Sequence, residues 1–218
     1  WVGASIGLRF ALALVAAPLL VTKVGLPGLF TLTCALALLG AAVVVWWVPA
    51  EPAKQQNAPR GRMADVWKNA DLMRLNLGVF VLHTVQMAMW MAVPALLVQA
   101  GLGKDLHWQV YLPAVVVSFL FLGGLFAMER RGLLRATLLA SIALVLVVQL
   151  GLAWVSWNGQ PPGLWTLGLL LLVFFCGFNA LEASQPSLVS RMAPASIRGA
   201  ALGSYNMLQS FGLFAGGA

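Results

Sequence analysis

Three ionisable side chains stand inside long apolar stretches of the sequence, where charges are rare: Arg9, His83 and Glu182. Placing a charged side chain at the centre of a bilayer costs at least about 2.5–3.5 kcal/mol, so such residues often serve transport or proton transfer. A carboxylate and an imidazole in these positions can exchange protons with a water-filled cavity. The structural alternatives are a side chain that reaches the membrane surface and a packed, hydrogen-bonded residue.

The depth of His83 and Glu182 can be counted from the nearest basic residues. His83 follows Arg74 by nine residues, and Glu182 precedes Arg191 by nine residues. At about 1.5 Å per helical residue, both side chains lie roughly 13 Å inside the same membrane boundary. Equal depth allows them to meet if their two helices face one cavity.

Uncharged polar residues accompany these candidates. Asn179 precedes Glu182 by three positions and Gln86 follows His83 by three, so each pair shares one side of a helix. Tyr205 stands in the last apolar stretch, among several other polar residues. All of these are candidate residues of a substrate or proton pathway.

The composition indicates which elements must position these residues. Of 218 residues, 61% are hydrophobic and only 9% are charged, whereas a soluble domain carries about 25% charged residues. Lipid must therefore cover much of the surface, and an all-α polytopic membrane protein is predicted. The net charge of +7 does not indicate nucleic acid, because the basic residues fall in short loops between apolar runs.

Catalytic and cofactor motifs are weak or absent from the sequence. No metal-ligand spacing, phosphate-binding loop or dinucleotide fingerprint is present, so no metal or other cofactor is expected. Cys34 and Cys176 stand in apolar runs and are interpreted as small core residues. Gly3, Ser5 and Gly7 match the nucleophile elbow of hydrolases, which leaves an intramembrane enzyme as one alternative. Close helix packing by the two glycines is the favoured explanation.

Seven apolar runs reach the roughly 20 residues that a spanning helix needs. Between the second and third runs, Met63 to Met73 is predicted to form a short interfacial helix. The glycines of the last run, at 199, 203, 212 and 216, favour close packing. The seven runs are Trp1–Val21, Gly28–Val48, Leu75–Gln99, Trp108–Met128, Ala136–Trp157, Leu164–Pro186 and Gly199–Ala218.

The orientation follows from the loop charges. The loops after the second, fourth and sixth runs hold ten Lys and Arg residues, whereas the loops after the first, third and fifth hold only Lys23 and Lys104. Basic loops stay in the cytoplasm. We therefore expect a multi-pass inner-membrane protein with the Pro49–Arg74 loop on the cytoplasmic side. Because the sequence starts and stops inside apolar runs, we also expect it to be an internal piece of a longer protein.

Several segments resemble a known family. The sequence resembles the major facilitator superfamily of twelve-span transporters, and within it the YajR-like branch of drug:proton antiporters. The resemblance covers nearly the whole chain and is most specific in the segment around Asn179 and Glu182. The segments that carry it are Gly3-Ala4-Ser5-Ile6-Gly7 with Ala17-Pro18, Asp71-Leu72-Met73-Arg74 with Leu82-His83, Phe174-Phe175 with Phe178-Asn179, Glu182-Ala183 and Pro186-Ser187-Leu188, and Gly199, Gly203, Tyr205, Gln209 and Gly212.

The resemblance implies a partial major facilitator fold of about seven helices, the fifth to the eleventh. Residues 1–48 would be the last two helices of the first bundle, residues 49–74 the loop between the bundles, and residues 75–218 the second bundle. The loop residues Glu129, Arg130 and Arg131 resemble a degenerate copy of the family's cytoplasmic gating motif. Arg9 would be a cavity charge of the first bundle, and its acidic partner is expected outside this sequence.

The function that follows is secondary active transport by alternating access. The resemblance favours proton-coupled efflux of small amphipathic organic compounds, with protons, a small-molecule substrate and the lipid bilayer as partners, by a protein that is a monomer at full length. One alternative is a facilitator or symporter for a sugar or nucleoside. Another is a membrane scaffold or sensor without transport.

Overall fold

The computed structural model describes residues 2–49, 62–157, 159 and 162–218, and it leaves out the side chains of residues 2–11, 14, 15, 18, 19, 125, 126 and 129. Every regular element in these ranges is a helix, which confirms the predicted all-α class. In chain order they are α1 (Val2–Trp47), α2 (Met63–Lys68), α3 (Ala70–Gln99), the short 3-10 helix η1 (Lys104–Leu106), α4 (Trp108–Arg130), α5 (Leu134–Trp157), α6 (Leu164–Met192) and α7 (Arg198–Gly217).

Five helical segments of the described residues are long and apolar enough to cross a membrane. They correspond to the second to sixth predicted spans. The first predicted span forms the start of α1, where many side chains lie outside the described part of the structure. The seventh forms α7, a helix of 20 residues that is too polar to qualify as a span by itself. The five segments are Leu20–Trp47, Ala70–Gln99, Lys104–Gly124, Leu134–Trp157 and Leu164–Met192.

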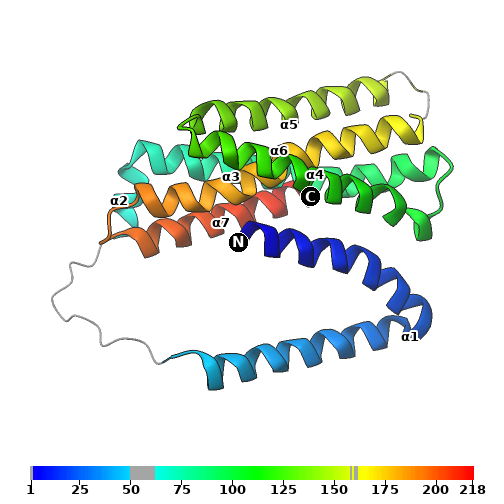
Figure 1. The fold of residues 1–218 in the computed structure, drawn as a ribbon, viewed down its shortest axis with the longest axis horizontal. Coiled ribbons are helices and arrows are strands. Elements are labelled where there is room, and N and C mark those ends of the chain that lie inside the picture. The colour runs from blue at the N-terminus through cyan, green and yellow to red at the C-terminus, as the bar shows by residue number, and fades with distance from the viewer. Residues whose placement is uncertain (1, 50–61, 158, 160–161) are drawn as a thin grey trace.

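The first two predicted spans run together in α1 and separate at Gly25. This glycine has φ +68° and ψ −179°, a backbone conformation outside the helix. A side chain would be strained there, so glycine is the residue that tolerates the break. Figure 1 shows α1 turning back at this end, so that its two halves diverge like the arms of a V.

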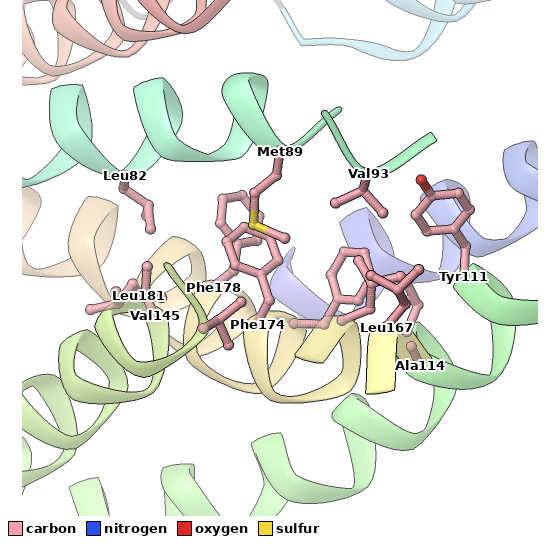
Figure 2. Packing of buried hydrophobic residues seen from close by; sticks show 14 of the residues in the cluster. Leu82, Met89, Val93, Tyr111, Ala114, Val145, Leu167, Phe174, Phe178 and Leu181 are labelled. Atoms are coloured by element: carbon pink, nitrogen blue, oxygen red, sulfur yellow. The ribbon is translucent and has the colours of Figure 1, made fainter. Parts of the chain in front are cut away.

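The other helices pack as a bundle around α6, which contacts α3, α4, α5 and α7. Rings from α6 fill the centre: Phe174 stacks on Phe178 with 5.5 Å between the ring centroids. Met89 and Val93 of α3 are buried against the same cluster, as Figure 2 shows. This apolar contact fixes α3 and α6 side by side, and these helices carry two of the candidate site residues.

Glycines allow the closest approach between α3 and α7. A Cβ atom at Gly212 would meet the carbonyl oxygen of Phe80, and one at Gly216 would meet that of Thr84. These two positions confirm the predicted close packing. At Gly199 and Gly203 the prediction is wrong, because a Cβ atom there would meet nothing within 4 Å.

The interfacial helix predicted from Met63 to Met73 is shorter than expected. It ends at Lys68 as α2, and α3 then begins at Ala70 rather than at Leu75. Asn69 causes the division, since its side-chain oxygen accepts hydrogen bonds from the backbone N–H groups of Asp71 (3.1 Å) and Leu72 (3.2 Å). An asparagine in this position is a strong helix N-cap.

Candidate functional site

His83 of α3 and Glu182 of α6 face each other inside the bundle. Nε2 of His83 lies 3.3 Å from Oε2 of Glu182. The histidine side chain is 3% exposed and the glutamate side chain 23% exposed. The two residues that the sequence placed at equal depth therefore lie in direct contact, and the carboxylate keeps partial access from outside the bundle.

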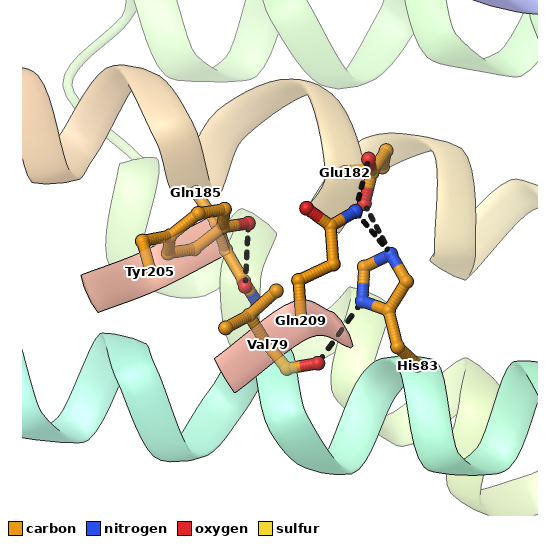
Figure 3. A network of polar contacts seen from close by, with 6 residues as sticks. All are labelled: Val79, His83, Glu182, Gln185, Tyr205 and Gln209. Carbon is orange, nitrogen blue, oxygen red and sulfur yellow. Dashed lines mark hydrogen bonds and ion pairs between the residues drawn. The ribbon is translucent and has the colours of Figure 1, made fainter. Parts of the chain in front are cut away.

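The orientation of the His83 ring is fixed by its own helix. Nδ1 lies 3.0 Å from the carbonyl oxygen of Val79, one turn earlier. Because that carbonyl can only accept, Nδ1 carries a proton and Nε2 is directed at Glu182 (Figure 3). The edge contact with the Phe178 ring, at 5.9 Å between centroids, holds the imidazole from the α6 side.

Gln209 of α7 joins the pair and was not among the predicted site residues. Its amide nitrogen lies 2.7 Å from His83 Nε2 and donates to Glu182 Oε1 at 3.4 Å. Glu182 Oε2 is buried and has no hydrogen bond to any described residue. Three helices thus meet at one polar cluster, His83–Glu182–Gln209. The available signal was the spacing of Tyr205 and Gln209, four residues apart on one side of α7.

Tyr205 lies one helical turn from this cluster and bonds to a different residue of α6. Its hydroxyl donates to Gln185 Oε1 at 3.4 Å, and both side chains are buried. Gln185 was also missed by the sequence analysis. The contact ties α7 to α6 beside the cluster, as the left side of Figure 3 shows.

Two other predicted residues do not join the cluster. Asn179 donates to the hydroxyl of Ser118 on α4 at 2.8 Å, so it joins α6 to α4 rather than to Glu182. Gln86 is partly buried on α3, and no hydrogen bond of its side chain to another described residue is present. The side chains of Arg9 and Glu129 lie outside the described residues.

Arg130 and Arg131 of the predicted gating loop are exposed where α4 ends. The turn that follows is completed by Gly132 at φ +81° and leads directly into α5. The position agrees with a short basic loop, and the gating role of these residues stays a prediction.

An apolar cavity of about 640 Å³ lies between α4 and α6 and is open to the surface, because its lining residues Trp165 and Leu169 are 92% and 62% exposed. Leu172, at one edge of the cavity, precedes Glu182 by ten residues. The cavity edge is therefore about 15 Å along α6 from the polar cluster. The polar side chain at its wall is Gln109, and the apolar lining includes Val110, Pro113, Val117, Trp165, Leu169 and Leu172.

A bundle of apolar helices that encloses ionisable and amide side chains is typical of membrane transporters. The comparisons with known proteins identify the class: a model of the Major Facilitator Superfamily matches residues 1–217. The chain belongs to this family of membrane transporters. The interpretation of Ser5 as an enzyme nucleophile is therefore not retained.

Individual relatives are also similar to the chain. The "Inner membrane transport protein YajR" of Escherichia coli (strain K12) is 31% identical over 222 residues, an alignment that covers all of this chain and 48% of the relative. The "Uncharacterized transporter BU466" of Buchnera aphidicola subsp. Acyrthosiphon pisum is 28% identical over 224 residues, covering 99% of this chain and 55% of the relative. The chain thus spans about half the length of these curated relatives.

Proposed function

We propose that the intact protein is a secondary active transporter of the inner membrane that couples efflux of small amphipathic organic compounds to proton entry. The observation that carries this proposal is the contact between His83 and Glu182 within a bundle of spanning helices. The printed name of the E. coli relative supports the inner membrane as the location.

The chemistry of the proposed coupling depends on competition for one carboxylate. When ionised, Glu182 attracts either a proton or the cationic part of a substrate, but it cannot hold both. Its partial exposure leaves the carboxylate accessible, while the His83 side chain beside it is buried. Binding of the substrate at Glu182 would therefore release a proton, and binding of a proton would release the substrate.

The apolar cavity between α4 and α6 supports an amphipathic substrate. Its wall offers Trp165 and aliphatic side chains but few hydrogen-bonding groups. A sugar or nucleoside would leave many of its hydroxyl groups unpaired against such a wall, at a cost for each buried group. The lining therefore favours an organic compound with an apolar body over the sugar or nucleoside alternative.

The proposal includes the predicted division of the chain. Residues 1–48 would belong to one bundle and residues 75–218 to the other, with residues 49–74 joining them in the cytoplasm. Rocking of the two bundles would expose the surface between them to each side of the membrane in turn, in a monomer. The direct packing of α3, α6 and α7 is compatible with one rigid group.

The test uses the intact protein in inside-out vesicles that carry a proton gradient. Addition of amphipathic cations should collapse the gradient in the wild type, and the Glu182→Gln variant should lose this response while it still inserts in the membrane. Asp105→Asn is the matched control, because it removes an exposed carboxylate from η1, outside the bundle. Collapse that persists in Glu182→Gln would remove Glu182 from the pathway. No collapse with any compound would contradict proton-coupled efflux.

A further inference from the structure

The amide of Gln209 is the only side chain of α7 that reaches both members of the His83–Glu182 pair among the described contacts. It lies 2.7 Å from His83 Nε2 and 3.4 Å from Glu182 Oε1. An amide nitrogen has two hydrogens and accepts none. Both contacts therefore use Gln209 as the donor, with one hydrogen for the imidazole and one for the carboxylate.

These hydrogen bonds indicate how many protons His83 and Glu182 hold together. The Nδ1 proton of His83 is committed to the Val79 carbonyl oxygen at 3.0 Å. Nε2 must then be free of a proton in order to accept from Gln209, so the imidazole is neutral. The carboxylate accepts as well. The structure therefore corresponds to the pair without an extra proton, held together by the Gln209 amide.

An added proton changes which atoms can bond. It enters the 3.3 Å space between His83 Nε2 and Glu182 Oε2, and these two atoms then bond directly. If Nε2 holds that proton, the Gln209 nitrogen faces another donor at 2.7 Å and the contact becomes repulsive. If Oε2 holds it, the lone pair of Nε2 is taken by the carboxyl group. Either way the amide nitrogen of Gln209 loses its bond to His83, and the amide must move or rotate.

We propose that Gln209 couples the proton occupancy of the His83–Glu182 pair to the position of α7. The proposal rests on the proposed function, since it assigns the residue that passes the proton signal to a helix. Gly212 follows Gln209 by one turn and touches the backbone of α3 at Phe80. At so close a contact α7 has no room to yield gradually, so loss of the amide bond favours a shift between two packed positions.

Among the described side chains, one other ionisable group lies close enough to interact with the charge of Glu182. The titratable side chain of α7 on this side is Tyr205, whose hydroxyl bonds to Gln185. The side chain of Arg9 on α1, which contacts α6, is outside the described residues. The described charged side chains of the packed helices stand toward the ends predicted to be cytoplasmic: Asp71 and Arg74 on α3, Arg130 on α4, Arg135 on α5, Arg191 on α6 and Arg198 on α7.

The test measures the position of α7 against pH in the intact protein in lipid nanodiscs. Cys34 and Cys176 are first replaced, and spin labels are attached at Leu139→Cys on the exposed side of α5 and at Gly203→Cys on α7, where added atoms meet open space. The wild type should show a pH-dependent change of about 1–2 Å in the label distance. Glu182→Gln should show none, and this comparison tests the proposal without altering Gln209.

Gln209→Met keeps the length of the side chain and removes both donors. We expect it to lose the pH-dependent distance change and to lower the number of protons moved per substrate by about fivefold or more. Ser210→Ala is the matched control, because among the described residues that hydroxyl bonds to the Asn206 carbonyl of its own helix, at 3.0 Å. A wild-type distance response in Gln209→Met or in Glu182→Gln, or no response in the wild type, would overturn the proposal.

The two proposals fail in different ways. If proton-coupled efflux is wrong, the wild type does not collapse a proton gradient with any compound. If only the role of Gln209 is wrong, the wild type collapses the gradient, Glu182→Gln does not, and Gln209→Met matches the wild type in both flux and distance response.

Discussion

A buried pair of small polar side chains, Asn76 and Ser204, joins α3 to α7 about two helical turns from the His83–Glu182–Gln209 cluster. The Asn76 amide donates to the Ser204 hydroxyl at 2.9 Å, and both side chains are almost fully buried. A hydrogen bond of this kind between membrane helices contributes about 0.6 kcal/mol on average and up to about 1.7 kcal/mol. This hydrogen bond therefore makes a small contribution to the packing of α3 on α7.

Removal of the Ser204 hydroxyl should lower the free energy of unfolding by about 1 kcal/mol, because the Asn76 amide then loses its oxygen partner in an apolar site. The measurement is reversible unfolding of Ser204→Ala in mixed micelles. Ser210→Ala, on the exposed side of the same helix, should change stability much less. Equal losses in the two variants would mean that burial of the Asn76–Ser204 bond adds nothing.

Part of the site could be predicted residue by residue. The contact between His83 and Glu182 could be predicted, because counting from the flanking arginines gives the same membrane depth for both residues. Counting does not give the direction of a side chain around the helix axis relative to other helices. Residues three apart differ by about 60° in direction, and this is enough to turn Asn179 toward Ser118 of α4 instead of toward the glutamate.

Gln209 was missed for a related reason. It stands 126 residues after His83, and only the packing of α7 on α3 brings the two together. The sequence shows that α7 is polar. It does not show which of its polar residues faces α3, which faces α6 and which faces outward.

At the scale of helices, the glycines of α7 separate into two classes that the sequence pattern cannot distinguish. Four of them, spaced by four residues in two pairs, suit helix packing. Gly212 and Gly216 approach the backbone of α3, whereas Gly199 and Gly203 meet open space. The difference depends on which side of α7 the partner helix occupies, and this is a tertiary property.

Gly212→Ala should therefore push α3 and α7 apart and destabilise the protein by about 1–3 kcal/mol, the usual cost of forcing an extra group into a packed interface. Gly203→Ala is the control on the same helix, and it should be neutral or slightly stabilising because alanine favours a helix. The comparison uses the thermal unfolding midpoints of both variants. A Gly212→Ala protein as stable as the wild type would show that the interface relaxes freely.

The break in α1 gives a second prediction at this scale. Gly25→Ala would place a side chain at φ +68°, with an expected cost of about 1–3 kcal/mol. Gly40→Ala, in a regular part of the same helix where the Cβ atom meets nothing, should be tolerated. Thermal unfolding again distinguishes them, and equal behaviour would mean that the two halves of α1 do not need this glycine.

For the molecule as a whole, the distribution of basic residues predicts opposite sides for two exposed loop positions. Lys104 belongs to the sparsely charged loops and Arg131 to the heavily charged ones. In cells with a permeabilised outer membrane and an intact inner membrane, Lys104→Cys should react with a membrane-impermeant maleimide. Arg131→Cys should react only after the inner membrane is opened. The reverse pattern would invert the predicted orientation.

The fold class itself was accessible from composition, since so apolar a chain has few alternatives to a helical bundle in lipid. The ends of helices were harder to predict where a single capping side chain determines them. The start of α3 at Ala70, five residues before the predicted start, depends on the Asn69 side chain and not on hydrophobicity.

The polarity of α7 has a consequence for how the protein is made. A segment this polar gains little by leaving the translocon for lipid alone. Ser204 and Gln209 of α7 bond to Asn76 and His83 of α3, a helix that is synthesised more than a hundred residues earlier. Insertion of α7 should therefore wait until α3 and α6 are in the bilayer and can receive it. Loss of one of these partners would then appear first as degradation of the newly made chain, before any change in transport could be observed.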